Sequence, residues 1–488
     1  MRRESDRVWR DWIKSWMYLQ VDRWSDNIAV IDDSGEKYKY GDIVDFSKCF
    51  GKWIPERSLI FILCKNCFAT IAAHIACIDN HIVPLMISAN MDVELLKGLI
   101  DLYKPMYIWC PDESKDKLDS VLCNSEDVAG QYGYLLIKLK NDNCDMYEDL
   151  AMLLTTSGTT GSPKLIRHSY FNLYSNAENV ANVFGFSEQD RALVDLKLHY
   201  TMGLNVACSN LYCGATIILT EHNPSEKEWW NIFREYKPTN MCGVPYSYEI
   251  LKQMRFFRKD HEELKIIAQG GGKLSDELCG IVAKYAVKYG KRFFATFGTS
   301  ETTARLAYLN PDKALEKIGS IGKAIPCGEM LLVDEFGNYI TDVEAEGELV
   351  YRGPNVTLGY AHKREDLAKK DERNGEYFTG DIARRDAEGY YYVQGRKGRF
   401  LKVYGYRVGL DECETILKNR YESDFACTGT DERLAIYHTN DVEDIEIRKF
   451  MSEKTGIQIS AFYSERIDFI PRNENGKINY GELLKRKV

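Results

Sequence analysis

Short apolar segments alternate with helical patterns from about Ile28 onward, and this alternation limits the fold more than any other feature of the chain. The segments that resemble buried strands are residues 59–63, 82–86, 107–109, 193–195, 216–220, 265–268 and 292–296. Several of them precede amphipathic patterns, for example residues 275–289, as strands do when helices connect them. The alternation predicts an α/β architecture.

A change of pattern divides the chain. Its 488 residues exceed what one hydrophobic core usually serves, so two or more domains are expected. From Gly347 the spacing predicts close strands with glycine-rich turns, and after Arg396 a compact, charged α+β region. Gly398 lies between two cationic residues and can absorb a backbone rotation. We therefore predict a large N-terminal domain of mixed α/β subdomains at residues 1–397 and a small, mobile α+β domain at residues 398–488.

Charge and composition narrow the classes of partner. A formal net charge of −9 argues against a general affinity for nucleic acid or anionic membranes, because like charges repel. The longest apolar runs are far shorter than the ~20 residues that cross a bilayer, and the N-terminus lacks the apolar core of a secretion signal. The 14 cysteines of such a chain are best interpreted as reduced thiols. These features predict a cytoplasmic protein with neither a membrane span nor a nucleic-acid partner.

One group of residues contains potential zinc ligands. Cys64, Cys67, His74 and Cys77 have a spacing that can be imagined around zinc. The same segment is typical of a buried strand followed by an apolar helix, and no second pair of cysteines completes a site. A structural role is therefore the favoured interpretation.

A loop rich in glycine and hydroxyl residues follows the apolar pair Leu153 and Leu154. Glycine lets backbone N–H groups turn toward an anion, hydroxyls add short donors, and a lysine adds a mobile positive charge. The residues concerned are Thr155, Thr156, Ser157, Gly158, Thr159, Thr160 and Lys164. Lys164 follows a proline, so the loop is not a Walker A motif. It predicts a phosphate-binding loop, and a flexible linker is the alternative.

Read with this loop, five further segments resemble the adenylate-forming superfamily, which includes acyl-CoA and aryl-CoA synthetases, luciferases and peptide-synthetase adenylation domains. The segments stand in the family's order and cover nearly the whole chain. They are Gly270-Gly271-Gly272-Lys273-Leu274, Phe297-Gly298-Thr299-Ser300-Glu301, Thr379-Gly380-Asp381, the hinge region from Gly395-Arg396 to Arg407, and Pro471 to Lys477. Any one of these motifs is weak, whereas all of them in sequence are very unlikely to arise by chance.

The resemblance implies a reaction and roles for these residues. A carboxylate is a poor electrophile, and transfer to AMP from ATP converts it into a mixed anhydride that a thiol can attack. Catalytic roles fall to Lys477, Glu301 and Lys164, with Glu301 also coordinating Mg²⁺. The residues implied in nucleotide binding are Thr155, Thr156, Ser157, Gly158, Thr159, Thr160, Gly270, Gly271, Gly272, Phe297, Gly298, Thr299, Asp381, Arg396 and Lys402.

The resemblance also implies a second step and an acyl pocket. Gly405 and Arg407 would line the path of CoA or of a carrier-protein phosphopantetheine after the small domain rotates about its hinge. His199, Tyr200 and Tyr246 would lie beside the small-molecule carboxylate. A packed histidine at position 199 is an equally good interpretation, and the identity of the acid is not readable from sequence.

Two other functions remain open at this point. The adenylate could pass to an amine or hydroxyl, or the chain could bind nucleotide without catalysis. Each site residue also has an ordinary structural interpretation, such as a turn cap for Asp381, a helix cap for Glu301, a surface ion pair for Arg396 and a solvated lysine for Lys477. The joint pattern favours the ATP-dependent activation of an acid.

Overall fold

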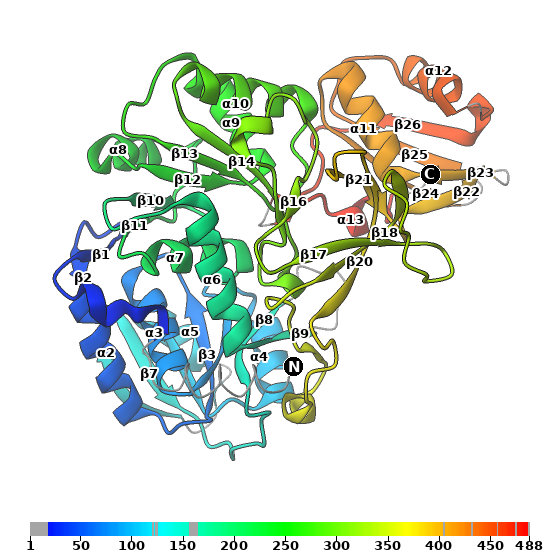
Figure 1. Ribbon diagram of the computed structural model, residues 1–488. Coiled ribbons are helices and arrows are strands. Elements are labelled where there is room, and N and C mark those ends of the chain that lie inside the picture. Colours follow the sequence, from blue (N-terminus) through cyan, green and yellow to red (C-terminus); the bar gives the residue numbers. More distant parts are fainter. Residues whose placement is uncertain are drawn as a thin grey trace.

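The computed structural model describes residues 18–119, 122, 125–155, 164–403, 406–430, 433–455, 457–473 and 476–486, with only the backbone described for Asp119, Phe400, Lys402, Tyr406 and Arg407. Two large sheets with intervening helices form most of the chain, a smaller sheet follows them, and the C-terminal elements gather beside that smaller sheet (Figure 1). The predicted α/β architecture, with a large N-terminal part and a C-terminal α+β part, is confirmed.

The first large sheet has eight strands in the order β19-β9-β8-β4-β3-β5-β7-β6. Its strands are β3 (Leu59–Cys64), β4 (Val83–Ser88), β5 (Tyr107–Pro111), β6 (Glu126–Gln131), β7 (Tyr134–Lys138), β8 (Leu150–Thr155), β9 (Leu165–Ser169) and β19 (Gly359–Ala361). Every residue of β3 is buried, as expected for a central parallel strand covered on both faces. The helices that accompany this sheet are α2 (Tyr40–Trp53), α3 (Phe68–Asp79), α4 (Val93–Tyr103) and α5 (Lys115–Asp119).

The second large sheet has nine strands in the order β16-β15-β14-β13-β12-β10-β11-β1-β2. Its strands are β1 (Ile28–Ile31), β2 (Lys37–Lys39), β10 (Arg191–Val194), β11 (Thr216–Leu219), β12 (Asn240–Gly243), β13 (Ile266–Gln269), β14 (Arg292–Phe297), β15 (Ala307–Tyr308) and β16 (Lys323–Ala324). Its helices are α6 (Tyr170–Phe184), α7 (Thr201–Leu211), α8 (Lys227–Tyr236), α9 (Pro245–Gln253) and α10 (Asp276–Lys288). One continuous apolar core joins both sheets through α3, α6 and α7.

A four-stranded antiparallel sheet leads into the C-terminal part. It comprises β17 (Glu329–Val333), β18 (Ala345–Arg352), β20 (Glu376–Arg385) and β21 (Tyr391–Arg396). The C-terminal elements are β22 (Phe400–Val403), β23 (Tyr406–Gly409), α11 (Leu410–Tyr421), β24 (Phe425–Thr430), β25 (Arg433–His438), α12 (Asp444–Thr455), β26 (Phe462–Arg466) and α13 (Tyr480–Leu483). They enclose a core of their own, which is the physical basis for regarding them as a separate unit.

The residues on the two sides of the expected hinge form ion pairs with different parts of the chain. Lys397 contacts Glu348 of β18 (2.6 Å), whereas Arg399 contacts Glu414 of α11 (2.9 Å). Between them, a side chain added to Gly398 would meet no atom within 4 Å. The chain therefore leaves the four-stranded sheet and enters the C-terminal unit within three residues.

Candidate active site

A buried carboxylate and an arginine form the best-defined pair of the site. Asp381 and Arg396 face each other across β20 and β21, and Arg396 Nε lies 2.8 Å from Asp381 Oδ1. The other oxygen, Oδ2, is buried and accepts no hydrogen bond from the described residues. Burial raises the pKa of Asp381 to about 6, although Arg396 opposes the shift. An unsatisfied buried acceptor of this kind is suited to receive hydroxyl donors from a ligand.

Lys477 reaches this pair from the C-terminal unit. Its position follows a turn in which Asn473 N–H donates to the Lys477 carbonyl (2.8 Å) and Lys477 N–H donates to Asn473 Oδ1 (3.0 Å). The side chain of Lys477 is exposed, yet partial desolvation by the surrounding protein and the neighbouring Arg396 lower its pKa, while Glu301 and Asp381 act in the opposite direction. The structure thus brings Lys477, Glu301, Asp381 and Arg396 within electrostatic reach of one another.

Tyr360 joins Glu301 to the lysine of the phosphate loop. The Tyr360 hydroxyl donates to Glu301 Oε1 (2.7 Å), and Lys164 Nζ lies 4.0 Å from the centre of the Tyr360 ring. Burial, followed by the charge of Glu301, raises the pKa of Tyr360 to about 12. The arrangement results from pairing of β19 with β9, which begins directly after Lys164. Lys164 and Glu301, far apart in sequence, therefore both contact Tyr360.

Sequence reasoning missed Tyr360. It stands 59 residues after Glu301, and a single tyrosine in a short strand carries no local signal of function. Only the antiparallel pairing of Tyr360 with Ile166 brings it beside the loop. The residue belongs with the candidate site on geometry alone.

The segment around Phe297 is held in a tight conformation. A Cβ on Gly298 would lie 1.5 Å from the carbonyl oxygen of Ala304, so only glycine fits there. Thr299 N–H donates a hydrogen bond to Thr302 Oγ1 (3.2 Å) at the start of the short helix that carries Glu301. Phe297, at the end of β14, is partly buried and contacts the neighbouring core. The motif therefore fixes the direction of Glu301.

The glycine segment lies at the carboxyl end of β13. Gln269 Nε2 donates to the Gly272 carbonyl (2.6 Å) and so closes the turn. A Cβ on Gly270 would meet Met202 Cε at 2.6 Å, and Gly271 has φ +78°, a conformation that favours glycine. The absence of a side chain at Gly270 therefore allows Met202, in the first turn of α7, to pack against this segment.

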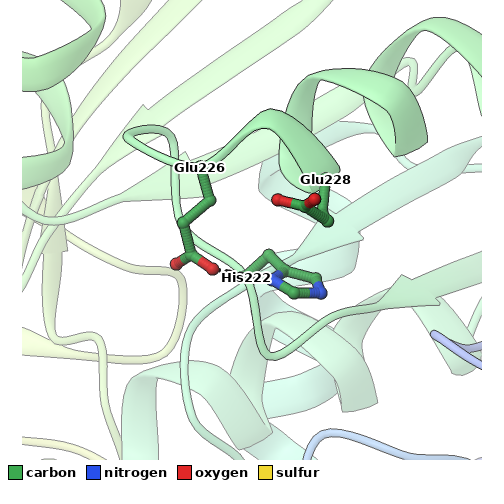
Figure 2. Close-up of side chains that lie close together, drawn as sticks. All are labelled: His222, Glu226 and Glu228. Carbon is green, nitrogen blue, oxygen red and sulfur yellow. Dashed lines mark hydrogen bonds and ion pairs between the residues drawn. The ribbon is translucent and has the colours of Figure 1, made fainter.

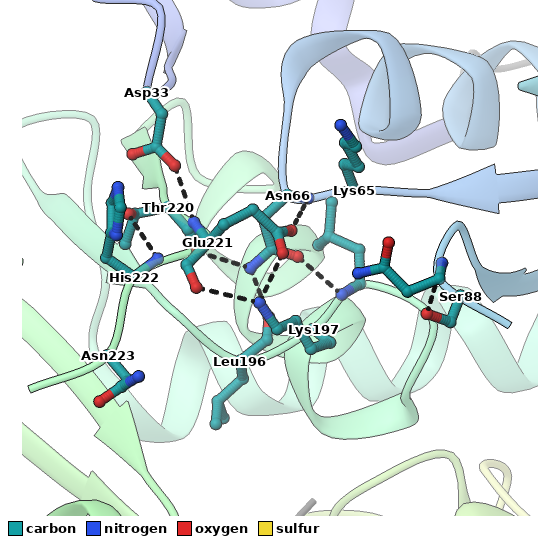
Figure 3. A network of polar contacts seen from close by, with 12 residues as sticks. Asp33, Lys65, Asn66, Ser88, Leu196, Lys197, Thr220, Glu221, His222 and Asn223 are labelled. Atoms are coloured by element: carbon teal, nitrogen blue, oxygen red, sulfur yellow. Dashed lines mark hydrogen bonds and ion pairs between the residues drawn. The ribbon is translucent and has the colours of Figure 1, made fainter. Parts of the chain in front are cut away.

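His199 and Tyr200 immediately precede α7, and a polar network holds the loop that carries them (Figure 3). Asn66 accepts a hydrogen bond from Leu198 N–H (3.0 Å) and donates to the Leu196 carbonyl (3.1 Å). His199 is 6% exposed, its Nε2 has no partner among the described residues, and burial lowers its pKa to about 4. It is therefore a neutral, packed imidazole.

The network crosses from one large sheet to the other. Asn66 follows β3 of the eight-stranded sheet, and its amide also donates to the carbonyl of Thr220, which follows β11 of the nine-stranded sheet (3.0 Å). Glu221 accepts from Asn66 N–H (2.5 Å) and pairs with Lys197 (2.6 Å). These bonds satisfy the loop's backbone groups and fix the entry to α7.

Tyr246 meets the C-terminal unit. A Cβ on Gly476 would lie 3.4 Å from Tyr246 Cβ, and the Arg472 guanidinium lies 5.8 Å from the tyrosine ring. Arg472 is itself paired with Asp424 (2.7 Å). Tyr246 thus borders both units, beside the turn that carries Lys477.

Several predicted residues lie outside this description. Thr155 is described and ends β8. The other predicted residues of the phosphate loop before Lys164 lie outside the described part of the chain: Thr156, Ser157, Gly158, Thr159 and Thr160. Gly405 is also outside it. Lys402 and Arg407 are paired across β22 and β23, with their backbone alone described.

The one cluster of potential metal ligands found among the described residues is His222, Glu226 and Glu228, whose ligand atoms lie within 4.8 Å of one another (Figure 2). His222 Nδ1 and Glu226 Oε2 are 2.7 Å apart, and both side chains are partly exposed. The pair satisfies itself without an ion. Cys64 and Cys77, two of the potential zinc ligands in the sequence, are buried in the apolar core.

Comparison with known proteins identifies the family. Residues 18–361 match the model of the AMP-binding enzyme family. The chain is 30% identical over 269 residues to a 3-hydroxybenzoate–CoA ligase from Aromatoleum sp. (strain CIB), covering 55% of this chain and 50% of that enzyme. It is 28% identical over 342 residues to a 2-succinylbenzoate–CoA ligase from Bacillus velezensis, covering 68% of each.

Solved structures agree on the fold. The O-succinylbenzoate coenzyme A synthetase of Bacillus subtilis, solved in complex with AMP, superposes with a TM-score of 0.78 at 20% identity, covering 96% of this chain and 98% of that one. At this identity the likeness establishes the fold. Together with the family match over most of the chain, it confirms the resemblance read from the motifs: the chain belongs to the AMP-binding enzyme family, within the adenylate-forming superfamily.

Proposed function

We propose that this chain uses ATP to convert a carboxylic acid into an acyl-adenylate, releases pyrophosphate, and transfers the acyl group to the thiol of CoA or of a carrier phosphopantetheine. The observation that carries the proposal is the approach of Lys477, from the C-terminal unit, to Asp381, Arg396 and Glu301 of the large domain. One cation and two carboxylates thus lie close enough for their charges to influence Lys477. The relatives named as CoA ligases support a thiol acceptor, and a carrier protein stays a prediction.

In the first step, a carboxylate oxygen of the substrate attacks the α-phosphorus of ATP, and the bond to the β-phosphate oxygen breaks. The acyl-adenylate and pyrophosphate are the products. Negative charge grows on oxygens around phosphorus, so fixed cations aimed at that region lower the barrier. Lys477 supplies such a charge beside the α-phosphate, and Lys164 supplies one to the phosphates that leave.

Asp381 and Arg396 are assigned to the nucleotide's sugar. The buried Oδ2 of Asp381 accepts the hydrogen bonds of ribose hydroxyls, while Arg396 keeps the carboxylate ionised and oriented through Oδ1. Phe297 and the Gly270–Gly272 segment border the base. With these residues assigned to the nucleotide, the acid is assigned to the region beside His199, Tyr200 and Tyr246.

Glu301 fits a magnesium ion. Oε1 accepts from Tyr360, and Oε2 makes no hydrogen bond or ion pair within the described residues. A hard carboxylate oxygen fixed in direction suits Mg²⁺, which neutralises phosphate charge when bound. Lys164, which lies against the Tyr360 ring, would add a further positive charge for the phosphates.

The thiol step requires a different position of the C-terminal unit. In it the thiolate attacks the acyl carbonyl, AMP departs, and the thioester forms. Gly398 is assigned as the pivot between residues 1–397 and 398–488, supported by the exchange of ion-pair partners on its two sides. Rotation withdraws Lys477 and brings Gly405 and Arg407 toward the acyl-adenylate.

We infer a cytoplasmic location from cysteine usage. All cysteines in the described part of the chain are free thiols, as a reducing compartment favours. No helix in that part combines the length and apolar character needed to cross a membrane.

The proposal is tested by measuring pyrophosphate release with ATP, Mg²⁺ and a panel of carboxylic acids, beginning with hydroxybenzoates and 2-succinylbenzoate because the relatives are named for them. Acid-dependent exchange of labelled pyrophosphate into ATP is expected, followed by thioester formation when CoA is added. Turnover without a thiol would favour transfer to an amine or hydroxyl. ATP binding without exchange would show a nucleotide-binding protein that does not catalyse.

Asp381→Asn is expected to weaken ATP binding by about tenfold, because the acceptor of the ribose hydroxyls becomes in part a donor. In the unsubstituted chain, affinity should fall as the pH drops through about 6, where Asp381 takes up a proton. Calorimetric titration with ATP at pH 5.5, 6.5 and 7.5 measures both effects. An equal affinity of the two proteins at pH 7.5 would contradict the assignment to ribose.

Although Asp381→Asn is expected to weaken ATP binding, it is expected to stabilise the folded protein. Because burial raises the pKa of Asp381 from 3.8 to about 6, its ionisation opposes folding above pH 6, and the penalty disappears as the pH falls below 3.8. The shift corresponds to about 2 to 3 kcal/mol. Asp381→Asn should therefore raise the melting temperature at pH 7.5 and have little effect near pH 4.

Tyr360→Phe is expected to lower kcat/KM for ATP by about three- to tenfold, because Glu301 loses one hydrogen bond that orients it. The matched control is Tyr339→Phe, which removes a hydroxyl that donates to Glu376 over the same 2.7 Å at an exposed site. Steady-state kinetics with varied ATP measures the difference. Equal effects of both substitutions would remove Tyr360 from the site.

A further inference from the structure

Arg373 lies between β19 and β20 in the chain, and its guanidinium packs against two tyrosine rings. The guanidinium carbon lies 4.6 Å from the centre of the Tyr360 ring and 4.8 Å from the centre of the Tyr377 ring, both within the range of a cation–π interaction. Nη1 also donates a hydrogen bond to Thr357 Oγ1. Among the described residues the Arg373 side chain forms no ion pair, so these three contacts define its position.

The main chain around Arg373 is anchored independently of its side chain. The Asp371 carboxylate accepts hydrogen bonds from the N–H groups of Arg373 (2.9 Å) and Asn374 (3.0 Å), as an aspartate at the start of a turn commonly does. Glu372 N–H donates to the carbonyl of Leu358 (2.9 Å). A substitution of the Arg373 side chain leaves these bonds in place, so its effect can be assigned to loss of the guanidinium.

Thr357 connects Arg373 to the main chain of Glu301. Thr357 is fully buried, and its hydroxyl accepts a hydrogen bond from Arg373 Nη1 and donates one to the Glu301 carbonyl (3.0 Å). The N–H group of Thr357 donates to the same carbonyl (3.0 Å). Because the guanidinium occupies an acceptor position of the hydroxyl, the hydroxyl hydrogen is directed at Glu301. The main chain of the short helix that carries Glu301 is thus held by two donors.

Tyr360 connects Arg373 to the side chain of Glu301. Its hydroxyl donates to Glu301 Oε1 (2.7 Å), and the direction of this donor depends on the tilt of the ring. The Arg373 guanidinium lies against that ring and restricts the tilt. One guanidinium therefore contacts both residues that bond Glu301 from the segment 357–360.

We propose that Arg373 is a positioning residue for metal binding by Glu301. It holds Thr357 and Tyr360, and through them it fixes the main chain and one carboxylate oxygen of Glu301, so that the other oxygen points in one direction. The proposal rests on the proposed function, in which Glu301 coordinates Mg²⁺. Magnesium tolerates little deviation from octahedral geometry, so a carboxylate of fixed direction binds it more tightly than a mobile one. Partners of metal ligands commonly contribute about 10- to 100-fold to metal affinity or activity.

The Mg²⁺ dependence of pyrophosphate release is measured in three variants. Arg373→Met removes the guanidinium and should raise the Mg²⁺ concentration that gives half the maximal rate by about tenfold. Arg373→Lys keeps a charge that can lie against the rings, and the rise should be only about threefold. The matched control is Arg384→Met, which removes a guanidinium that lies 4.4 Å from the centre of the Tyr392 ring at an exposed position of β20. It should leave the Mg²⁺ requirement unchanged.

Calorimetric titration with ATP gives a readout that does not depend on turnover. In the presence of Mg²⁺, Arg373→Met should bind ATP about tenfold more weakly than the unsubstituted chain. With EDTA in place of Mg²⁺, the two proteins should bind ATP with the same affinity, because Arg373 is not assigned to the nucleotide itself. Weaker binding in EDTA as well would make Arg373 a ligand of the phosphates and would overturn the positioning role.

Two further variants test the route through Glu301 and guard against misfolding of Arg373→Met. Thr357→Val removes the hydroxyl and leaves Arg373 on both rings, and it should raise the Mg²⁺ requirement by about two- to fivefold. Arg373→Met combined with Glu301→Gln should need no more Mg²⁺ than Glu301→Gln alone, because the carboxylate that Arg373 positions is already lost. Additive effects of the two substitutions would overturn the proposal.

The outcomes separate the positioning role from the function on which it rests. Pyrophosphate release with an Mg²⁺ requirement that neither Arg373→Met nor Thr357→Val alters would overturn the positioning role while the proposed function stands. Failure of every acid to release pyrophosphate would overturn the proposed function. In that case the calorimetric comparison of Mg²⁺ with EDTA still decides the role of Arg373.

Discussion

Replacing Lys477 with alanine is expected to lower acid-dependent pyrophosphate release by about 10²- to 10³-fold. The lysine approaches Glu301, Asp381 and Arg396, and its charge is assigned to the oxygens that become more negative as the α-phosphorus is attacked. Its lowered pKa reflects a partly desolvated setting, in which electrostatic interactions are stronger than in water. Single-turnover measurement of pyrophosphate release gives the effect on the chemical step.

The control is Lys485→Ala, which removes an exposed lysine from the same C-terminal region. It should retain the activity of the unsubstituted chain. Lys477→Ala supplied with a synthetic acyl-adenylate should still form the thioester, because Lys477 is assigned to the first step alone. An unchanged rate of pyrophosphate release in Lys477→Ala would show that the arrangement of the two units seen here is not the one that forms the adenylate.

The strands and helices of the large domain were predictable because their signals are local. An apolar run such as β3 or an amphipathic pattern such as α10 carries its own evidence, and both appear within a few residues of the expected bounds. The predicted segment at residues 265–268 is β13 at Ile266–Gln269, shifted by one residue. Errors of that size concern only the first and last residues of an element, which depend on capping and fraying.

Long-range pairings were not predictable from those signals. The edge strand β19 of the eight-stranded sheet lies nearly two hundred residues after β9 in the chain. The sequence of Gly359–Ala361 does not indicate that it pairs with β9. Tyr360 enters the site through this pairing, and Asn66 joins the two sheets through loop carbonyls. Contacts of this kind depend on topology, which one sequence leaves open.

The candidate site shows the same division. Motifs predict Lys164, Glu301, Asp381 and Lys477 as site residues. In the structure Lys164 and Glu301 both contact Tyr360, and Glu301 and Asp381 influence the pKa of Lys477. Arg305 stands close to one of those motifs, and its burial could not be predicted because a lone arginine usually lies in solvent.

Glu301→Gln is expected to lower pyrophosphate release by about 10²-fold and to raise the Mg²⁺ concentration that gives half the maximal rate. Gln keeps the size of the side chain and can still accept from the Tyr360 hydroxyl, while it loses the charge that suits a hard cation. Titration of Mg²⁺ at saturating ATP measures the requirement, and calorimetry with and without EDTA measures how strongly Mg²⁺ assists ATP binding. Glu316→Gln, at a partly exposed ion pair with Lys313, is the control and should leave both quantities unchanged. A low rate with an unaltered Mg²⁺ requirement would instead assign Glu301 to positioning Tyr360 and Lys164, because loss of charge would then have acted on the protein and not on the cation.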